Sequence, residues 1–112
     1  MSFFKFEVYV PITHSEKVKQ ALSNSGAGKL GNYDSCMWTT SGEGQFRPIK
    51  GSKPFIGKEN ILEKIEEVKI ECIVEKKYIK NIIKEMKLNH PYETPSYQFW
   101  PVYIDEILNN LI

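Results

Sequence analysis

The stretch His90-Pro91-Tyr92-Glu93-Thr94-Pro95 lies between a run of apolar residues at helical spacing and a run rich in aromatic residues. Each proline restricts its own φ angle and favours extended backbone in the residue before it. An imidazole, a phenol and a carboxylate therefore lie on a stiff connection, which we call the ledge (residues 90–95). The pattern predicts a helix before the ledge and a strand after it.

The elements on either side of the ledge follow from periodicity. Apolar residues at helical spacing predict an amphipathic helix from Tyr78 to Asn89, and the run from Tyr97 to Tyr103 is typical of an aromatic strand. Before that helix, residues 68–74 alternate between apolar and charged side chains, which predicts a strand with one buried face. Asp105 to Ile112 suggests a short terminal helix.

The first part of the chain repeats the order of strand and helix. Residues 3–10 alternate in the same way, and Pro11 ends the predicted strand. Thr13 and Glu16 have the spacing of a capping box, which predicts a helix start. Gly26 is well suited to the left-handed residue that ends such a helix.

The middle of the chain is rich in glycine and aromatic residues. Tyr33 to Thr40 predicts a strand, Ser41 to Gly44 a turn, Gln45 to Ile49 a short returning strand and Gly51 to Gly57 an irregular loop. The predicted order is therefore β-α-β-β-β-α-β. It indicates a ferredoxin-like α+β sandwich, an antiparallel sheet with two helices on one face, formed by residues 1–112 as a single domain.

Two helices on one face leave the other face of the sheet uncovered. The aromatic and apolar strand residues outnumber those that two helices can bury, and an extensive apolar face is more often an interface than bare surface. The sequence therefore predicts a homo-oligomer. The residues assigned to this face are Tyr9, Ile73, Tyr97, Phe99 and Tyr103. In the alternative, residues 43–60 fold back and cover the face within one chain.

Composition narrows the classes of function. The chain has 112 residues, a net charge of +1, 41% hydrophobic and 26% charged residues, as expected for one soluble globular domain without the field that attracts nucleic acid or anionic lipid. No apolar run approaches the roughly 20 residues that span a bilayer, and the start lacks the regions of a signal peptide. Cys36 and Cys72 are far apart and favour reduced thiols in a cytoplasmic protein.

His90 and Glu93 have two interpretations. In the first, the imidazole and carboxylate hold a ligand or a metal ion at the end of the second helix, with Cys36 or Asp34 as further ligands. In the second, they hydrogen-bond to backbone groups and fix the start of the last strand. The spacing supplies two ligands, whereas zinc sites use three or four protein ligands. His14, the other histidine, is expected to be exposed in the first turn of the first helix.

Arg47 is the single arginine among 15 lysine and arginine residues. A planar fork of donors at this position suits a carboxylate or a phosphate, and the alternative is an ion pair with Glu43 or Glu93. The glycine spacing around it fits neither common phosphate-binding pattern. No serine or thiol lies in a pattern typical of a nucleophile. The candidate ligand-binding residues are Tyr33, Arg47, His90, Tyr92 and Glu93.

Four motifs in a fixed order carry a family resemblance. They are Gly31-Asn32-Tyr33, Gly42-x-Gly44-x-Phe46-Arg47-Pro48, Gly51-x-x-Pro54-Phe55-Ile56-Gly57 and His90-Pro91-Tyr92-Glu93-x-Pro95. Together they resemble the inserted domain of YqfO-type, NIF-three-like proteins, often labelled GTP cyclohydrolase type 2-like. The ledge is also similar to that of CutA proteins, which are trimers linked to divalent-cation tolerance. The resemblance covers nearly the whole chain and implies a CutA/PII-like fold and a homotrimer.

The resemblance implies a binding role without catalysis. Full-length family members carry a two-metal site in a separate core, and this sequence, with two histidines, does not reproduce it. We therefore expect a stand-alone, non-catalytic binding or regulatory module. Its small ligand or partner would lie in clefts where residues 31–57 meet the ledge of a neighbouring subunit. The alternative is binding of a divalent metal ion of the CutA kind through His90 and Glu93. An enzyme with one of these as general base is a third, less supported reading.

Overall fold

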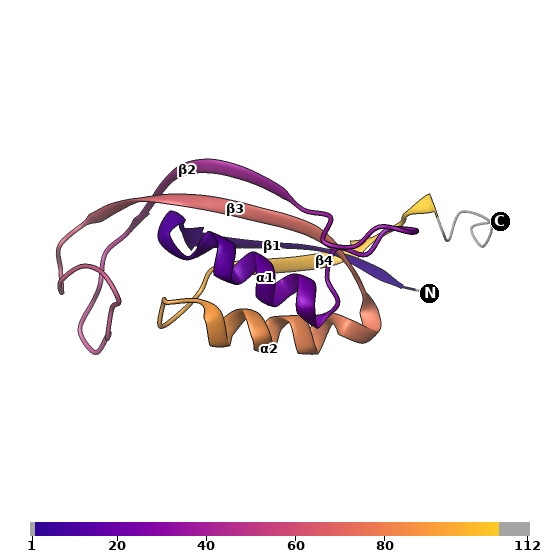
Figure 1. Ribbon diagram of the computed structural model, residues 1–112. Helices are drawn as coiled ribbons and strands as arrows, with labels where there is room; N and C mark the ends of the chain where they lie inside the picture. Colours follow the sequence, from indigo (N-terminus) through magenta and orange to yellow (C-terminus); the bar gives the residue numbers. More distant parts are fainter. Residues whose placement is uncertain (1, 106–112) are drawn as a thin grey trace.

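A computed structural model describes residues 2–105 of the chain. Four strands form one antiparallel sheet in the order β2-β3-β1-β4, and two helices lie together on one face of it (Figure 1). A short 3-10 turn precedes each helix. The α+β, ferredoxin-like architecture predicted from the sequence is confirmed. The elements are β1 (Phe3–Pro11), α1 (Ser15–Ser25), β2 (Trp38–Phe46), β3 (Glu63–Glu75), α2 (Ile79–Asn89) and β4 (Tyr97–Val102).

The core lies between the helices and the two central strands. Alternate residues of β1 and β3 point at the helices, as the period-two pattern predicted, and Val8 pairs with Ile70 in the register. Each fully buried aliphatic side chain contributes about 1.5–3 kcal/mol from removal of apolar surface from water. The largest buried side chains from the four elements include Phe6, Leu22, Ile70, Ile82 and Met86.

The sequence predicted the end of α1 correctly and the cap at its start incorrectly. Gly26 follows the helix with φ 115° and donates its N–H to the carbonyls of Leu22 and Ser23, which confirms the predicted helix end. The capping box is wrong. Thr13 Oγ1 instead lies 2.8 Å from His14 Nδ1, because the 3-10 turn moves the first helical residue to Ser15.

The middle of the chain forms one long strand instead of two short ones. Gly42 and Gly44 were expected in a turn, but they pair with Glu67 and Ile65 inside β2, so the predicted fifth strand is absent among residues 2–105. Residues 33–37 precede the strand. Neither glycine has a positive φ angle. Glycine permits a turn without requiring one, and in a strand it often marks close approach of another group.

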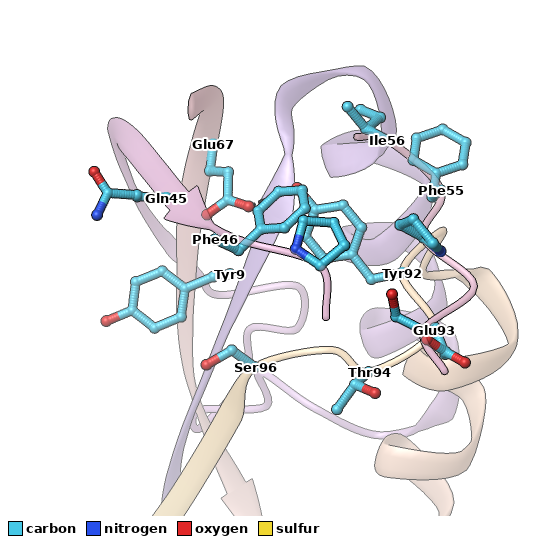
Figure 2. A pocket seen from close by; sticks show the side chains of 13 residues that line it. Tyr9, Gln45, Phe46, Phe55, Ile56, Glu67, Tyr92, Glu93, Thr94 and Ser96 are labelled. Atoms are coloured by element: carbon cyan, nitrogen blue, oxygen red, sulfur yellow. Dashed lines mark hydrogen bonds between the residues drawn. The ribbon is translucent and has the colours of Figure 1, made fainter. Parts of the chain in front are cut away.

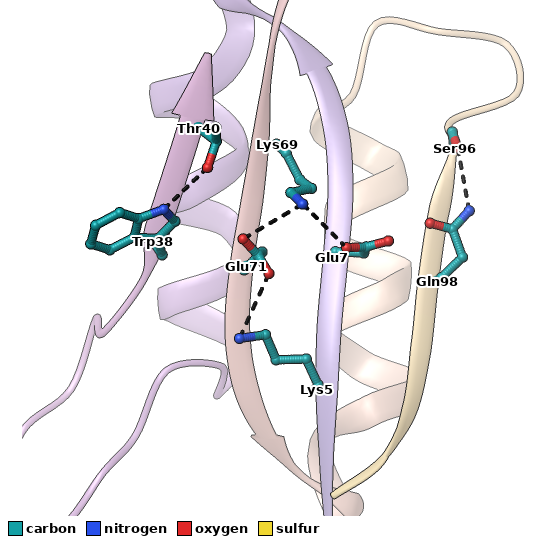
Figure 3. Close-up of polar contacts among 8 residues, drawn as sticks. All are labelled: Lys5, Glu7, Trp38, Thr40, Lys69, Glu71, Ser96 and Gln98. Atoms are coloured by element: carbon teal, nitrogen blue, oxygen red, sulfur yellow. Dashed lines mark hydrogen bonds and ion pairs between the residues drawn. The ribbon is translucent and has the colours of Figure 1, made fainter. Parts of the chain in front are cut away.

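The uncovered face of the sheet differs from its predicted character. Tyr97 pairs with Val8 and Phe99 with Phe6, so both belong to the helix-covered side. Tyr9 and Ile73 do lie on the uncovered face, but its centre is charged (Figure 3). Lys69 Nζ lies 4.0 Å from Glu7 and 3.8 Å from Glu71, and Lys5 Nζ lies 3.7 Å from Glu71. Trp38, opposite Glu71, and Trp100, opposite Lys5, also lie on this face, on the two edge strands. The predicted apolar character therefore fails at the centre of the face and for Tyr97 and Phe99, because the register of β4 could not be read from its composition.

Strands β2 and β3 run past the end of β1 and β4 as a long arm (Figure 1). The loop that joins them, which we call the arm loop (residues 47–62), curls around this end of the sheet and leaves the uncovered face open. Residues 43–60 therefore reach that face only at its end, where Tyr9 and the arm loop line one pocket, and the alternative in which they cover the face is wrong. The predicted terminal helix falls mostly outside the described residues. Neither described helix has the length and apolarity needed to cross a membrane.

Candidate functional site

A pocket of about 400 Å³ lies at the end of the sheet, between the ledge and the arm loop (Figure 2). Its walls come from segments far apart in the sequence: the ends of β1 and β2, the start of β3, the arm loop and the ledge. Pockets of this size with a few polar groups among aromatic side chains are typical of small-molecule sites. The lining residues are Tyr9, Gln45, Phe46, Pro48, Ser52, Pro54, Phe55, Ile56, Glu67, Tyr92, Glu93, Thr94 and Ser96.

His90 anchors the ledge beneath the pocket. Its side chain is buried, with 7% exposure. Nε2 lies 2.7 Å from the Tyr9 carbonyl oxygen, and Nδ1 accepts a hydrogen bond from the Tyr92 N–H at 3.1 Å. The neutral tautomer with its proton on Nε2 satisfies both contacts. The second interpretation from the sequence, an imidazole that fixes the backbone, therefore describes His90.

The pKa of His90 predicts how stability depends on pH. Burial lowers this pKa below its usual value, nearby His14 lowers it further, and the Tyr9 carbonyl and Glu67 carboxylate oppose the change. The unfolded chain therefore takes up the proton first as the pH falls. We expect full stability above about pH 6.5 and a loss of up to about 1.4 kcal/mol per pH unit below it, down to the folded pKa. Urea unfolding at pH 5 to 8 measures this.

A His90→Gln variant is the control for the pH dependence. Glutamine does not titrate, and His14 remains in both proteins. The unfolding free energy of the variant should change less between pH 7 and pH 5 than that of the unaltered protein. Equal slopes would show that the pKa of His90 does not differ between the folded and unfolded states.

Tyr92 joins the ledge to β3. Its hydroxyl donates a hydrogen bond to Glu67 Oε2 at 2.6 Å. Burial and this contact with the carboxylate raise the pKa of Tyr92 well above its usual value. The Glu67 side chain crosses β2 at Gly44, where a β-carbon would collide with its carboxylate. The absence of a side chain at Gly44 thus lets Glu67 reach the ledge.

Glu93 ties the ledge to the arm loop. Its Oε1 accepts the backbone N–H of Lys53 at 3.0 Å. Beside this contact, the ring of Tyr92 lies 5.9 Å from that of Phe46 and 6.5 Å from that of Phe55, centroid to centroid. These three rings form an aromatic wall (Phe46, Phe55 and Tyr92), which combines an apolar surface with the two carboxylates nearby (Figure 2).

The five candidate ligand-binding residues from the sequence do not all lie at the pocket. Tyr92 and Glu93 line the pocket, and His90 lies directly behind Tyr92, with ring centroids 5.0 Å apart. Arg47 lies next to the lining residue Phe46, but its guanidinium donates to Asn60 Oδ1 at 3.4 Å and is absent from the pocket lining. Among residues 2–105, no ion pair involves Arg47, including the two that the sequence suggested.

Tyr33 lies at the opposite end of the sheet from the pocket. It pairs with Leu30 in an isolated bridge and is 75% exposed. The segment is held by Gly28, which donates to the Ile73 carbonyl and accepts from Cys36. Asp34 and Cys36 share this end, so they do not approach His90 within one chain. Within residues 2–105, no three His, Cys, Asp or Glu side chains group in a way that could hold a metal ion.

Several residues of the pocket had no signal in the sequence. Glu67 belongs to a run of charged residues that is typical of a solvent-exposed strand end. Tyr9 is one of several aromatic residues in predicted strands, and nothing in the sequence distinguishes it from the others. His14 was expected to be exposed, but it is half-buried and its ring meets that of Phe55 edge-on at 5.4 Å. The glycine at position 44, spaced two residues before Phe46 in the family motif, was the available signal for close approach at this point.

Sequence relatives resemble nearly all of the chain. A GTP cyclohydrolase 1 type 2 homolog of Halalkalibacterium halodurans is 44% identical over 101 residues, and the protein of the same name in Bacillus subtilis is 43% identical over 98 residues. These alignments cover 90% and 88% of this chain but 27% and 26% of the relatives. The chain thus spans about a quarter of the length of these relatives. The chain matches no protein-family model.

Solved structures with a similar fold include a protein of the same kind as these relatives. A Bacillus cereus protein related to NIF3 is 38% identical, with a TM-score of 0.79 over 92% of this chain and 26% of its own. The divalent cation tolerance protein CutA of Archaeoglobus fulgidus has a TM-score of 0.65 at 17% identity over 96% of this chain and 92% of its own, which indicates a shared fold alone. The chain is therefore homologous to one domain-sized segment of the NIF3-related proteins named GTP cyclohydrolase 1 type 2 homolog.

Proposed function

We propose that this chain is a non-catalytic binding module that takes a small organic molecule in the pocket between the ledge and the arm loop. The observation that carries the proposal is the pocket itself, with its aromatic wall and two carboxylates fixed by contacts to other segments. A ligand there would touch the ledge, the arm loop and the sheet at once. Binding would therefore restrain the arm loop relative to the ledge.

The titratable groups around the pocket favour binding over catalysis. Both ring nitrogens of His90 contact backbone groups, and the phenol of Tyr92 is held protonated against Glu67. The Cys72 thiol is buried in the core, where burial raises its pKa to about 12. General acid–base catalysis works best with a pKa near the operating pH, and nucleophilic catalysis by cysteine needs a thiolate. His90 and Tyr92 are thus arranged as supports for a binding surface, and Cys72 lies in the core, outside the pocket lining.

A screen of small compounds by ¹H–¹⁵N NMR tests the binding role. We expect compounds that shift the amide signals of the aromatic wall, the ledge and the arm loop, with dissociation constants in the micromolar to millimolar range typical of fragments. Phe55→Ala should weaken their binding by about tenfold, since it removes part of the apolar wall. Ile49→Ala changes an exposed apolar residue of the same loop outside the pocket and is the control. A screen without any ligand at the pocket would contradict the proposal.

We also propose that the module works as a homo-oligomer, with a trimer favoured. Large apolar side chains are exposed on the two edge strands, with Trp38 69% exposed on β2 and Trp100 42% exposed on β4. An edge strand presents unpaired backbone groups as well, so these edges suit contact between copies. Tyr33, remote from the pocket in its own chain, could reach the pocket of a neighbour only in such an assembly.

Light scattering coupled to gel filtration measures the assembly. A trimer would have close to three times the 13.0-kDa mass of the chain. Trp38→Lys should reduce the mass if β2 takes part in the contact, whereas Leu88→Lys, a similarly exposed position on α2, should not. A mass equal to one chain at all concentrations would contradict the oligomeric part of the proposal and leave the pocket unaffected.

A further inference from the structure

The charge of the pocket is one-sided. Two of the thirteen lining residues, Glu67 and Glu93, carry a carboxylate, and none is a lysine, an arginine or a histidine. The arm loop does carry Arg47 and Lys53, but their side chains are absent from the lining, and Lys53 contributes its backbone N–H instead. An anionic ligand would therefore meet two carboxylates without a compensating cation in the wall.

Each carboxylate keeps one oxygen free for a ligand. Glu67 uses Oε2 to accept from Tyr92, and Glu93 uses Oε1 to accept from Lys53. Within residues 2–105, no side chain or backbone group donates to Glu67 Oε1 or to Glu93 Oε2. The engaged oxygen fixes the position of each group, and the other oxygen remains an acceptor that favours a charged N–H donor.

The aromatic wall adds a second preference for positive charge. The faces of aromatic rings attract cations, and cages of several rings recognise ammonium groups in this way. Here Phe46, Phe55 and Tyr92 stand beside Glu67 and Glu93. Flat apolar surface and negative charge thus coincide in one pocket, which suits a ligand with a planar apolar body and a cationic nitrogen head.

We infer that the pocket is selective for a small organic cation, an amidinium, guanidinium or ammonium compound with a planar apolar body, and that Glu67 is the group that recognises its charged nitrogen. This inference rests on the proposed binding function and adds the chemical class of the ligand. The head forms a charge-assisted hydrogen bond with Glu67 Oε1, and the body lies against the aromatic wall.

Gly44 is the positioning residue for this recognition. The Glu67 carboxylate lies in the space that a side chain at position 44 would take, so an alanine there must displace the carboxylate from the position in which it accepts from Tyr92. Gly42 lies two residues earlier on the same face of β2, and a β-carbon there has no atom within 4 Å. The two glycines share strand and face, and neither has a positive φ angle. The pair Gly44→Ala and Gly42→Ala therefore separates displacement of Glu67 from the general effect of alanine in the strand.

Benzamidine, benzamide and benzoate are suitable probes, because they share a planar shape and differ in charge from positive through neutral to negative. Titration of each into ¹⁵N-labelled protein at pH 7.5 gives its affinity and the amide signals it shifts. We expect benzamidine to bind at the pocket at least about tenfold more tightly than benzoate, with benzamide between them. Raising the salt concentration should weaken the binding of benzamidine.

Three variants test whether Glu67 is responsible for the preference for benzamidine. Glu67→Gln and Gly44→Ala should each weaken benzamidine binding by about tenfold and leave benzamide binding within about twofold, and Gly42→Ala should change neither. The Glu67→Gln variant keeps an acceptor for the Tyr92 hydroxyl, and its folding is verified by the same NMR spectra.

The outcomes distinguish this inference from the proposed function. If benzoate binds as tightly as benzamidine, or if Glu67→Gln leaves the affinity for benzamidine unchanged, the inference is wrong while the pocket remains a binding site. If only Gly44→Ala behaves like Gly42→Ala, the positioning role of Gly44 is wrong. If no compound of any charge binds at the pocket in the screen, the proposed function and the inference both fail. Selective binding of benzamidine that depends on Glu67 and Gly44 supports both.

Discussion

Gly26→Ala is expected to lower the free energy of unfolding by about 3 kcal/mol. Gly26 ends α1 with φ 115°, a backbone conformation that costs an L-residue roughly 1–2 kcal/mol. A β-carbon at this position would also lie 2.6 Å from Cγ of Tyr78, inside the distance that packed carbon atoms tolerate. The ring of Tyr78 packs against the core and cannot withdraw without moving the start of α2, so overpacking adds about 1–3 kcal/mol. Urea unfolding measures the sum.

Gly31→Ala is the matched control for this prediction. Gly31 also has a positive φ angle, 56°, but a β-carbon there has no neighbour within 4 Å. This variant should lose about 1 kcal/mol, the cost of the left-handed backbone alone. A loss at Gly26 no larger than that at Gly31 would mean that the turn after α1 can move away from Tyr78.

His90→Ala is expected to lower the free energy of unfolding by about 2–3 kcal/mol and to weaken ligand binding at the pocket. The substitution removes two hydrogen bonds of about 1 kcal/mol each and leaves a cavity behind the ledge. Tyr92 would lose the contact that holds its backbone, so the aromatic wall would lose its fixed position. Urea unfolding and the NMR titration with benzamidine measure the two effects.

Two conservative variants separate the contributions of the two hydrogen bonds that His90 makes, to the Tyr9 carbonyl and to the Tyr92 N–H. Asparagine at position 90 can accept the N–H two residues on, as in an Asx turn, and so keeps the contact with Tyr92. Glutamine reaches farther and keeps a donor for the Tyr9 carbonyl. Each variant should recover about half of the lost stability, and His90→Asn should recover more of the ligand binding. Equal stability of His90→Ala and the unaltered protein would show that the ledge is held without the imidazole.

Local patterns were sufficient to predict the helices and the central strands. The alternation in residues 3–10 and 68–74 corresponds to the buried side of β1 and β3, and the apolar spacing after Tyr78 corresponds to the buried side of α2. Gly26 was identified as a helix end because its conformational freedom is a property of the residue itself. These features depend on neighbours a few positions apart, which a sequence displays directly.

Pairing between strands was predicted less well. The Gly42–Gly44 segment suits a turn when read alone, yet it lies in β2 because nine successive residues of that strand pair with β3. The face occupied by Tyr97 and Phe99 depends on the register between β4 and β1, and a shift of one residue reverses it. Composition carries no information about that register.

By itself, the sequence determined the α+β class, the buried faces of the helices and central strands, and the stiff ledge with its imidazole, phenol and carboxylate, because periodicity, proline and glycine act within a few residues. The tertiary structure alone decided that Tyr92 and Glu93 share a pocket with Glu67 and the arm loop, that His90 is a buried support, and that Tyr33 lies at the far end of the sheet. Those placements depend on how β1, β2, β3 and the ledge come together, with contacts 40 positions apart between Lys53 and Glu93 and 81 positions apart between His90 and Tyr9. Contacts at such separations are set by the packing of the whole sheet, and no local pattern of residues encodes them.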